Sequence, residues 1–279
     1  MRQCLWRGNT DNPRQSLAAW DLVCRPKNFG GLGVLNLGIQ NEALLLKHLF
    51  KFFNKVDVPW VSLIWDTYYA ASPPQSTQSC GSFWWRDIMR LYPKFCKLAV
   101  PQVHVGDTVL FWLDRWQLGN RVVLLHDCFP RLHSFVVDDA ITVKEFMERP
   151  DVLDHFHLPL SQEAYSELTQ LQALLPLINL DGESKDIWKW PSKSGVFMSK
   201  IYYDSCFSHL VVDPIFRWIW KCACTLKLKV FGWLLLMDGL NTRDMMQRRQ
   251  WIIQDDTCVL CNLAQHEDQP HLFFACNFS

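Results

Sequence analysis

The chain has 279 residues, of which 49% are hydrophobic and 14% aromatic. This content predicts one large domain or two smaller ones with real cores, and it argues against long disordered stretches. The longest uninterrupted apolar run, residues 230–237, is far too short to span a membrane. No apolar stretch follows the N-terminal Arg2, so we expect no signal peptide.

The formal net charge of zero conceals three charged blocks. Residues 1–55 carry a charge of +5, residues 138–186 a charge of −8, and residues 215–251 a charge of +5. Two basic blocks could hold a polyanion. Attraction between the basic blocks and the acidic middle explains the pattern equally well.

Eleven cysteines are present, and the expected lack of a signal peptide places them in an intracellular, reducing compartment. Free thiols and metal ligands are therefore favoured over disulfides. The nucleus and the cytoplasm fit equally.

The N-terminal part predicts a turn followed by two helices. Gly30, Gly31 and Gly33 could form a phosphate-binding loop, but a tight structural turn is favoured, since no clear strand precedes them. A helix is predicted over residues 40–54, with Leu46, Leu49, Phe50 and Phe53 on its buried face. A second helix is predicted over residues 60–69, after Pro59.

The best domain boundary is the polar, proline-containing segment at residues 72–79. Ser82 is expected to cap a short helix that ends before Pro93. Alternation around Gly106 and Asp107 predicts a β-hairpin over residues 103–116.

Further along, a helix is predicted over residues 160–174, a second hairpin over 188–197 and a helix over 198–205. Three more helices are expected at residues 215–222, 227–237 and 242–249, the last capped by Asn241 or Thr242. Cys222 and Cys224 would then lie two apart on a helix and point in different directions.

The C-terminal segment contains a strong metal-binding pattern. Two residues separate Cys258 from Cys261, nine separate Cys261 from His271, and four separate His271 from Cys276. Three thiolates and one imidazole suit a tetrahedral zinc ion, and a filled shell leaves no position for catalysis. We therefore predict a structural zinc knuckle with these four ligands, with unrelated core thiols as the alternative.

His266 is an alternative ligand, but the spacing from His271 to Cys276 gives the better helical face. A zinc site contributes on the order of 10 kcal/mol to folding. We expect Leu272, Phe273 and Phe274, which lie between ligands, to pack back on the domain. A second site at His126, Cys128 and His133 is disfavoured.

Catalytic motifs are absent from the sequence. No Gly-x-Ser-x-Gly elbow, His-Glu-x-x-His motif or phosphate-binding P-loop is present, so we predict that the chain is not an enzyme and has no small-molecule substrate. Basic residues do interleave with tryptophans, as in proteins that hold phosphates and stack unpaired bases. The residues predicted to contact RNA or DNA are Lys227, Lys229, Arg243, Arg248 and Arg249.

Several segments of the sequence resemble a known family. The run FRWIWKCACTLKLKVFGWLLLMDGLNTRDMMQRRQW, then CVLC, and then HLFFAC with Glu267 four residues before His271, resemble the zinc-binding region downstream of plant non-LTR (LINE-type) reverse transcriptases. The segments VCRPKNFGGLGVLNL, NEALLLKHLF and VGDTVLFWLDRW resemble the connection that precedes it.

The resemblance implies four segments: a post-polymerase connection at residues 1–70, a linker at 71–80, a middle region at 81–180 and the zinc-binding domain at 181–279. It also implies handling of RNA or target DNA during retrotransposition. The family's polymerase and endonuclease motifs are absent, so we expect a truncated remnant that depends on a reverse transcriptase supplied in trans.

The expected fold is α+β, predominantly helical, with short β-hairpins and a C-terminal zinc knuckle. The expected function is that of a non-catalytic, zinc-binding accessory module. The alternative is a structural or protein-interaction module, in which zinc only stabilises the C-terminal fold and the basic face docks the acidic middle or another chain.

Overall fold

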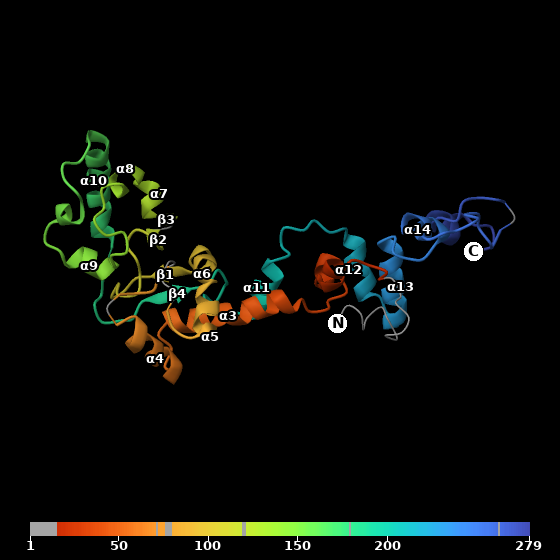
Figure 1. Cartoon of the computed structure of the whole chain (residues 1–279), viewed down its shortest axis with the longest axis horizontal. Coiled ribbons are helices and arrows are strands. Elements are labelled where there is room, and N and C mark those ends of the chain that lie inside the picture. The colour runs from red at the N-terminus through yellow and green to blue at the C-terminus, as the bar shows by residue number, and fades with distance from the viewer. Residues whose placement is uncertain (1–15, 71, 76–79, 119–120, 179, 262) are drawn as a thin grey trace. The chain divides into compact units, whose positions relative to one another are not determined.

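The computed structural model describes residues 16–70, 72–75, 80–118, 121–178, 180–261 and 263–279. The chain divides into two compact units (Figure 1). Unit 1 comprises Met1–Leu37 and Asp204–Ser279, and unit 2 comprises Gly38–Tyr203. These limits differ from the four segments expected from the sequence, which stay a prediction. Part of the expected linker, residues 76–79, lies outside the described residues.

Unit 1 is built from short helices at both ends of the chain. They are α2 (Trp20–Cys24), the 3-10 turn η1 (Lys27–Phe29), α12 (Pro214–Lys221), α13 (Leu226–Leu236), α14 (Arg243–Arg248) and the π-helical turn η4 (His271–Ala275).

The core of unit 1 brings the N-terminal segment against α13. Val23, Trp233 and Leu234 are buried together. The indole Nε1 of Trp233 donates a hydrogen bond to the carbonyl oxygen of Gly30 at 2.7 Å. Gly30 has a φ of 79° and ends η1, and a Cβ on Gly31 would lie 2.0 Å from the Arg25 carbonyl oxygen. The glycines therefore make the tight structural turn that the sequence favoured.

Unit 2 is mainly helical, with two small antiparallel sheets (Figure 1). Its first half contains α3 (Leu37–Phe53), α4 (Pro59–Tyr68), α5 (Phe83–Met89), α6 (Tyr92–Leu98), β1 (Val100–Gln102), β2 (Arg115–Leu118) and β3 (Arg121–Leu124). Its second half contains α7 (Leu125–Cys128), α8 (Pro130–His133), α9 (Val143–Glu148), η2 (Val152–His155), α10 (Gln162–Leu174), η3 (Leu175–Leu177), β4 (Ile187–Lys189) and α11 (Ser199–Ser205). The predominantly helical α+β fold is confirmed.

An aromatic core holds unit 2 together. Phe52 stacks on Trp65 with ring centroids 4.5 Å apart, and Phe53 contacts Trp188 at 4.9 Å. Leu46, Leu49 and Phe53 are buried as expected from their helical spacing, whereas Phe50 is half-buried. Burial of these large side chains supplies most of the driving force for folding this unit.

Both predicted hairpins are wrong. β1 pairs with β4, remote in sequence, and the local hairpin is β2–β3, nine residues beyond the predicted turn at Gly106. The buried carboxylate of Asp186 explains the first error, because it accepts hydrogen bonds from the amides of His104 and Gly106 at 2.8 Å and of Thr108 at 3.1 Å. These amides are therefore committed to a side chain instead of a strand ladder.

The predicted helix caps at Ser82 and Thr242 are confirmed. The Ser82 hydroxyl accepts a hydrogen bond from the Trp85 amide and caps α5, and Thr242 caps α14 in the same way. The short helix α5 ends at Met89, before Pro93, as predicted. A second helix, α6, begins at Tyr92 and has Pro93 in its first turn, where a backbone N–H has no partner within the helix and its absence costs nothing.

Candidate metal centre

The structure gathers the four predicted ligands. One ligand atom from each of Cys258, Cys261, His271 and Cys276 lies within 4.8 Å of the others. The Cys261 Sγ and His271 Nε2 atoms are 3.3 Å apart. A tetrahedral zinc ion with ordinary bond lengths would separate its ligand atoms by about 3.5–3.8 Å. The donor set therefore has both the chemistry and the spacing of a closed zinc site.

A compact loop supplies the first two ligands. The amide of Cys258 donates to the Gln265 carbonyl at 2.7 Å, and the amide of Glu267 donates to the Asp256 carbonyl at 2.8 Å. These bonds close the loop and hold Cys258 near Cys261.

A π-helical turn supplies the other two ligands. The Asp268 carboxylate accepts a hydrogen bond from the His271 amide at 2.7 Å and so satisfies the start of the turn. The Cys276 amide donates to the His271 carbonyl at 2.7 Å. This is the i→i+5 bond of a π-helix, and single π-turns occur often at functional sites.

Backbone hydrogen bonds act on two of the thiols. A backbone hydrogen bond from Phe278 is the main reason that the pKa of Cys276 is lowered. A backbone hydrogen bond from Leu263 lowers the pKa of Cys261, but burial and the neighbouring thiols outweigh it, so that the pKa of Cys261 is raised overall. A bound cation would favour the thiolate in both residues, and hydrogen bonds of this kind orient metal ligands.

The structure shows which of the two candidate histidines, His271 or His266, belongs to the ligand cluster. His271 is buried within the cluster. His266 is exposed, and its ring nitrogens lie 3.4 Å from an Asp244 carboxylate oxygen and 3.0 Å from one of Asp256. Hydrogen bonds to Asp244 and Asp256 raise the pKa of His266. His266 therefore links the loop to α14 and is not a member of the cluster.

Glu267 fastens the ligand loop to α14. This buried carboxylate accepts a hydrogen bond from the Arg243 amide at 3.3 Å and lies 3.9 Å from the Arg243 guanidinium. The same guanidinium donates to the carbonyl oxygens of Asp255 at 3.0 Å and Thr257 at 2.8 Å. Arg243 therefore holds the metal loop through hydrogen bonds to two of its backbone carbonyls and through its contact with Glu267.

Three further residues of the predicted nucleic-acid-binding set also have protein partners. Lys229 donates to the Trp220 carbonyl at 3.1 Å. Arg248 forms 2.6 Å ion pairs with Asp238 and Asp244, and the hydrogen bond to Asp238 is the main reason that its pKa is raised.

Arg249 donates to the Leu17 carbonyl, and burial lowers its pKa. Lys227 is exposed and has no hydrogen-bond or ion-pair partner among the described residues. Contact of these five residues with nucleic acid stays a prediction.

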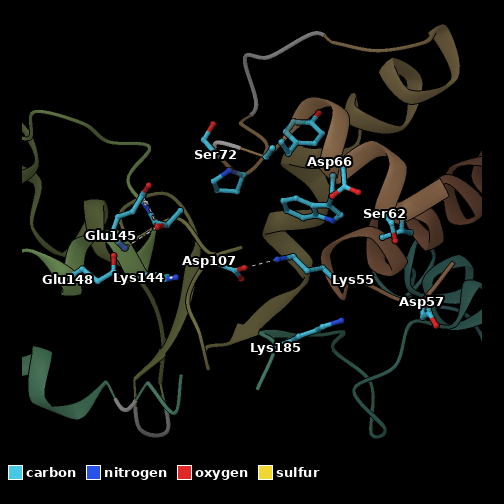
Figure 2. A pocket seen from close by; sticks show the side chains of 16 residues that line it. Lys55, Asp57, Ser62, Asp66, Ser72, Asp107, Lys144, Glu145, Glu148 and Lys185 are labelled. Atoms are coloured by element: carbon cyan, nitrogen blue, oxygen red, sulfur yellow. Dashed lines mark hydrogen bonds and ion pairs between the residues drawn. The ribbon is translucent and has the colours of Figure 1, made fainter. Parts of the chain in front are cut away.

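A second candidate site is a polar pocket of about 730 Å³ in unit 2 (Figure 2). Figure 2 shows Lys55 extended toward Asp107, and their charged atoms are 2.6 Å apart. Lys55 also lies over the Trp65 ring, at 4.9 Å from its centroid. Lys144 faces Glu148 at 3.9 Å. Lys55 and Lys144 are therefore both paired with carboxylates of the pocket.

The disfavoured second metal site does not form. His126 pairs with the carboxylate of Asp127 at 3.0 Å. In the described part of the chain, the one group of metal-ligating side chains is the C-terminal cluster. No described helix is long and apolar enough to cross a membrane.

Comparison with known proteins agrees with this geometry. Residues 197–279 match the family described as zinc-binding in reverse transcriptase. The chain is 23% identical over 281 aligned residues to an Arabidopsis thaliana protein named "Putative ribonuclease H protein", covering 93% of this chain and 42% of that protein. It is 30% identical over 118 residues to an "Uncharacterized mitochondrial protein" of Arabidopsis thaliana, covering 40% of this chain and 75% of the relative. No solved structure matches the chain significantly.

The fold and the ligand cluster define a zinc-binding module of the kind associated with reverse transcriptases. The chain belongs to this reverse-transcriptase zinc-binding family, as its resemblance to plant retroelement proteins predicted. It spans less than half the length of the ribonuclease H relative, so that relative's activity does not pass to this chain by similarity.

Proposed function

We propose that the chain is a zinc-stabilised, non-catalytic accessory module of a LINE-type reverse transcriptase that contacts single-stranded RNA or DNA. The four-ligand cluster within the family match carries this proposal. A polymerase supplied in trans would perform the chemistry. A reducing, intracellular setting is part of the proposal, because the ligand thiols must stay unoxidised to bind zinc.

The ligand segment buries little apolar surface. Val259, Leu263, Phe274 and Phe278 are 52–77% exposed, so the expected packing of Phe274 is wrong. Phe273 does contact Phe231, with ring centroids 5.8 Å apart. Apolar burial therefore contributes little here, whereas zinc contributes on the order of 10 kcal/mol to such a fold.

Exposed groups on α12 support contact with nucleic acid. Trp218 is 66% exposed, and Arg217 and Lys221 are exposed beside it. Arg217 and Lys221 lie one turn apart, and Trp218 lies three residues before Lys221, so that the three side chains are neighbours on the helix surface. An aromatic face can stack an unpaired base while the two cations contact its flanking phosphates. The sequence contained this signal. In the structure Lys221 has no hydrogen-bond or ion-pair partner among the described residues, whereas Arg217 donates to the Asn28 carbonyl oxygen at 3.4 Å.

The zinc part is tested by metal analysis of the purified full chain. We expect one zinc per chain, and loss of zinc in Cys258→Ser. Cys128→Ser, at an exposed cysteine in unit 2, is the matched control and should keep its zinc. A folded wild-type protein without zinc would contradict this part.

The nucleic-acid part is tested by the affinity for single-stranded RNA and DNA as a function of salt. Lys221→Ala removes one phosphate contact. It should reduce the magnitude of the slope of log affinity against log salt concentration by about 0.7. Trp218→Ala should cost about 1–3 kcal/mol of binding free energy without changing that slope. Arg90→Ala is the control, because this exposed arginine lies in unit 2, is paired with Asp87 at 2.7 Å and is not in the predicted binding set.

A protein-interaction module is the second candidate. The exposed apolar side chains of the ligand segment favour it, since clustered apolar surface marks interaction sites. Absence of RNA and DNA binding at low salt, together with intact zinc binding, would select this alternative.

A further inference from the structure

The turn between α12 and α13 holds two thiols against each other. The Sγ atoms of Cys222 and Cys224 are 3.1 Å apart. The sequence prediction that these side chains point in different directions is therefore wrong. Both residues lie in unit 1 and outside the zinc cluster.

The helix ends before the two cysteines. α12 ends at Lys221, and Cys222 is its extended C-cap residue, with ψ at 151°. The amide of Cys224 then donates to the carbonyl of Cys222 at 3.0 Å, which closes a three-residue γ-turn. This turn brings the two Cβ atoms to one side, whereas a helix would separate them by about 200°.

The two thiols differ in accessibility. The Cys222 thiol is half-buried and donates to the Ile219 carbonyl at 2.9 Å. Cys224 is exposed. A dissolved oxidant therefore reaches Cys224 first and finds Cys222 already adjacent.

The distance between the sulfurs favours a covalent link. A disulfide has an S–S length of about 2.05 Å, so that the two sulfurs must approach by only about 1 Å. The exposed loop between two short helices can supply that movement without disturbing the buried Trp233 core.

We propose that Cys222 and Cys224 form a reversible disulfide modification site that responds to peroxides. The Cys224 thiolate attacks one peroxide oxygen and becomes a sulfenic acid, while the other oxygen leaves as hydroxide and is protonated to water. The Cys222 thiolate then attacks the sulfenic sulfur, the S–S bond forms, and the hydroxyl leaves as a second water. Two thiols are oxidised and one peroxide is reduced to two waters.

Peptide mapping tests this directly, because trypsin cuts after Lys221 and Lys227 and releases both cysteines on one peptide. The zinc-loaded full chain is treated with equimolar hydrogen peroxide at about pH 8, where more thiol is ionised. N-ethylmaleimide is then added and peptide 222–227 is weighed. We expect it to be lighter by two hydrogens and to carry no maleimide, and to take up two maleimides after reduction with dithiothreitol.

Variants separate a built pair from general thiol oxidation. Cys224→Ser should abolish the intrapeptide disulfide, and Cys128→Ser should change its rate less than about twofold. Zinc release is followed in the same sample and should lag behind disulfide formation, because metal-bound thiolates are shielded. The proposal is overturned if peptide 222–227 carries two maleimides while Cys128 is oxidised, or if zinc leaves before the disulfide forms.

Discussion

The backbone amide of Cys276 donates a hydrogen bond to the carbonyl of His271 at 2.7 Å, so one π-helical turn joins the last two metal ligands. Their spacing in the sequence is therefore a geometric requirement. One inserted residue would rotate the Cys276 side chain by roughly 80–100° away from the cluster.

We predict that inserting one alanine between Phe274 and Ala275 lowers zinc affinity by about tenfold or more. Competition with a chromogenic chelator measures this. One alanine appended after Ser279 is the control and should keep wild-type affinity. Equal affinities of the two insertions would show that the π-turn does not set the ligand geometry.

Glu267 should matter for stability although it is not a ligand. Its buried carboxylate holds the Arg243 amide and faces the Arg243 guanidinium. We expect Glu267→Ala to lower the free energy of unfolding by on the order of 2–3 kcal/mol, since a charged hydrogen-bond acceptor is lost.

Urea denaturation of the zinc-loaded protein measures this loss. Glu148→Ala removes an exposed carboxylate that lies 3.9 Å from Lys144, and should cost less than about 0.5 kcal/mol. A Glu267→Ala loss as small as that of the control would mean that Glu267 does not support the metal loop.

Asp186 should be among the most sensitive positions of unit 2. Its carboxylate accepts hydrogen bonds from three amides and from the Thr108 hydroxyl at 2.9 Å. Asp186→Ala leaves these donors unsatisfied, and we expect a loss on the order of 3–5 kcal/mol. Thermal unfolding measures the loss, and Asp57→Ala, at an exposed site, should stay within about 0.5 kcal/mol.

Asp114 should make stability depend on pH. Burial raises the pKa of Asp114 to about 7, although hydrogen bonds from the Leu110 amide and the Cys96 thiol oppose the shift. The folded state thus binds this proton more tightly than the unfolded state. The contribution of protonated Asp114 to the free energy of unfolding is therefore fully present below about pH 4 and is lost as the pH rises through about 7.

The measurement compares wild type with Asp114→Asn by denaturant unfolding from pH 4 to pH 8. The difference between them should change by up to about 4 kcal/mol, with wild type losing stability toward alkaline pH. Asp139→Asn, at an exposed carboxylate, should run parallel to wild type. A parallel course for Asp114→Asn as well would show that the Asp114 pKa is not raised.

Features set by neighbouring residues could be predicted from the sequence. The Ser82 and Thr242 caps, the buried stripe of α3 and the glycine turn at Gly30 all depend on a few adjacent positions. The ligand set belongs to the same class, because each pair of ligands lies within one turn or loop.

Features set by remote partners could not be predicted. The β1 strand pairs with β4, and Asp186 draws in amides about 80 residues earlier. Alternation of apolar residues around Gly106 carried no information about either contact.

The sequence by itself determined the family, the helical character and the chemistry of the zinc ligands, because residue type and short spacing fix which atoms can meet one ion. The tertiary structure decided which cations are free and which histidine joins the ligands. It also decided that Cys222 lies against Cys224. The free cations and the choice of histidine depend on hydrogen bonds and ion pairs made by groups outside the local turn, and only the folded chain brings those groups together. The cysteine contact depends on where α12 ends, which is earlier than the sequence predicted.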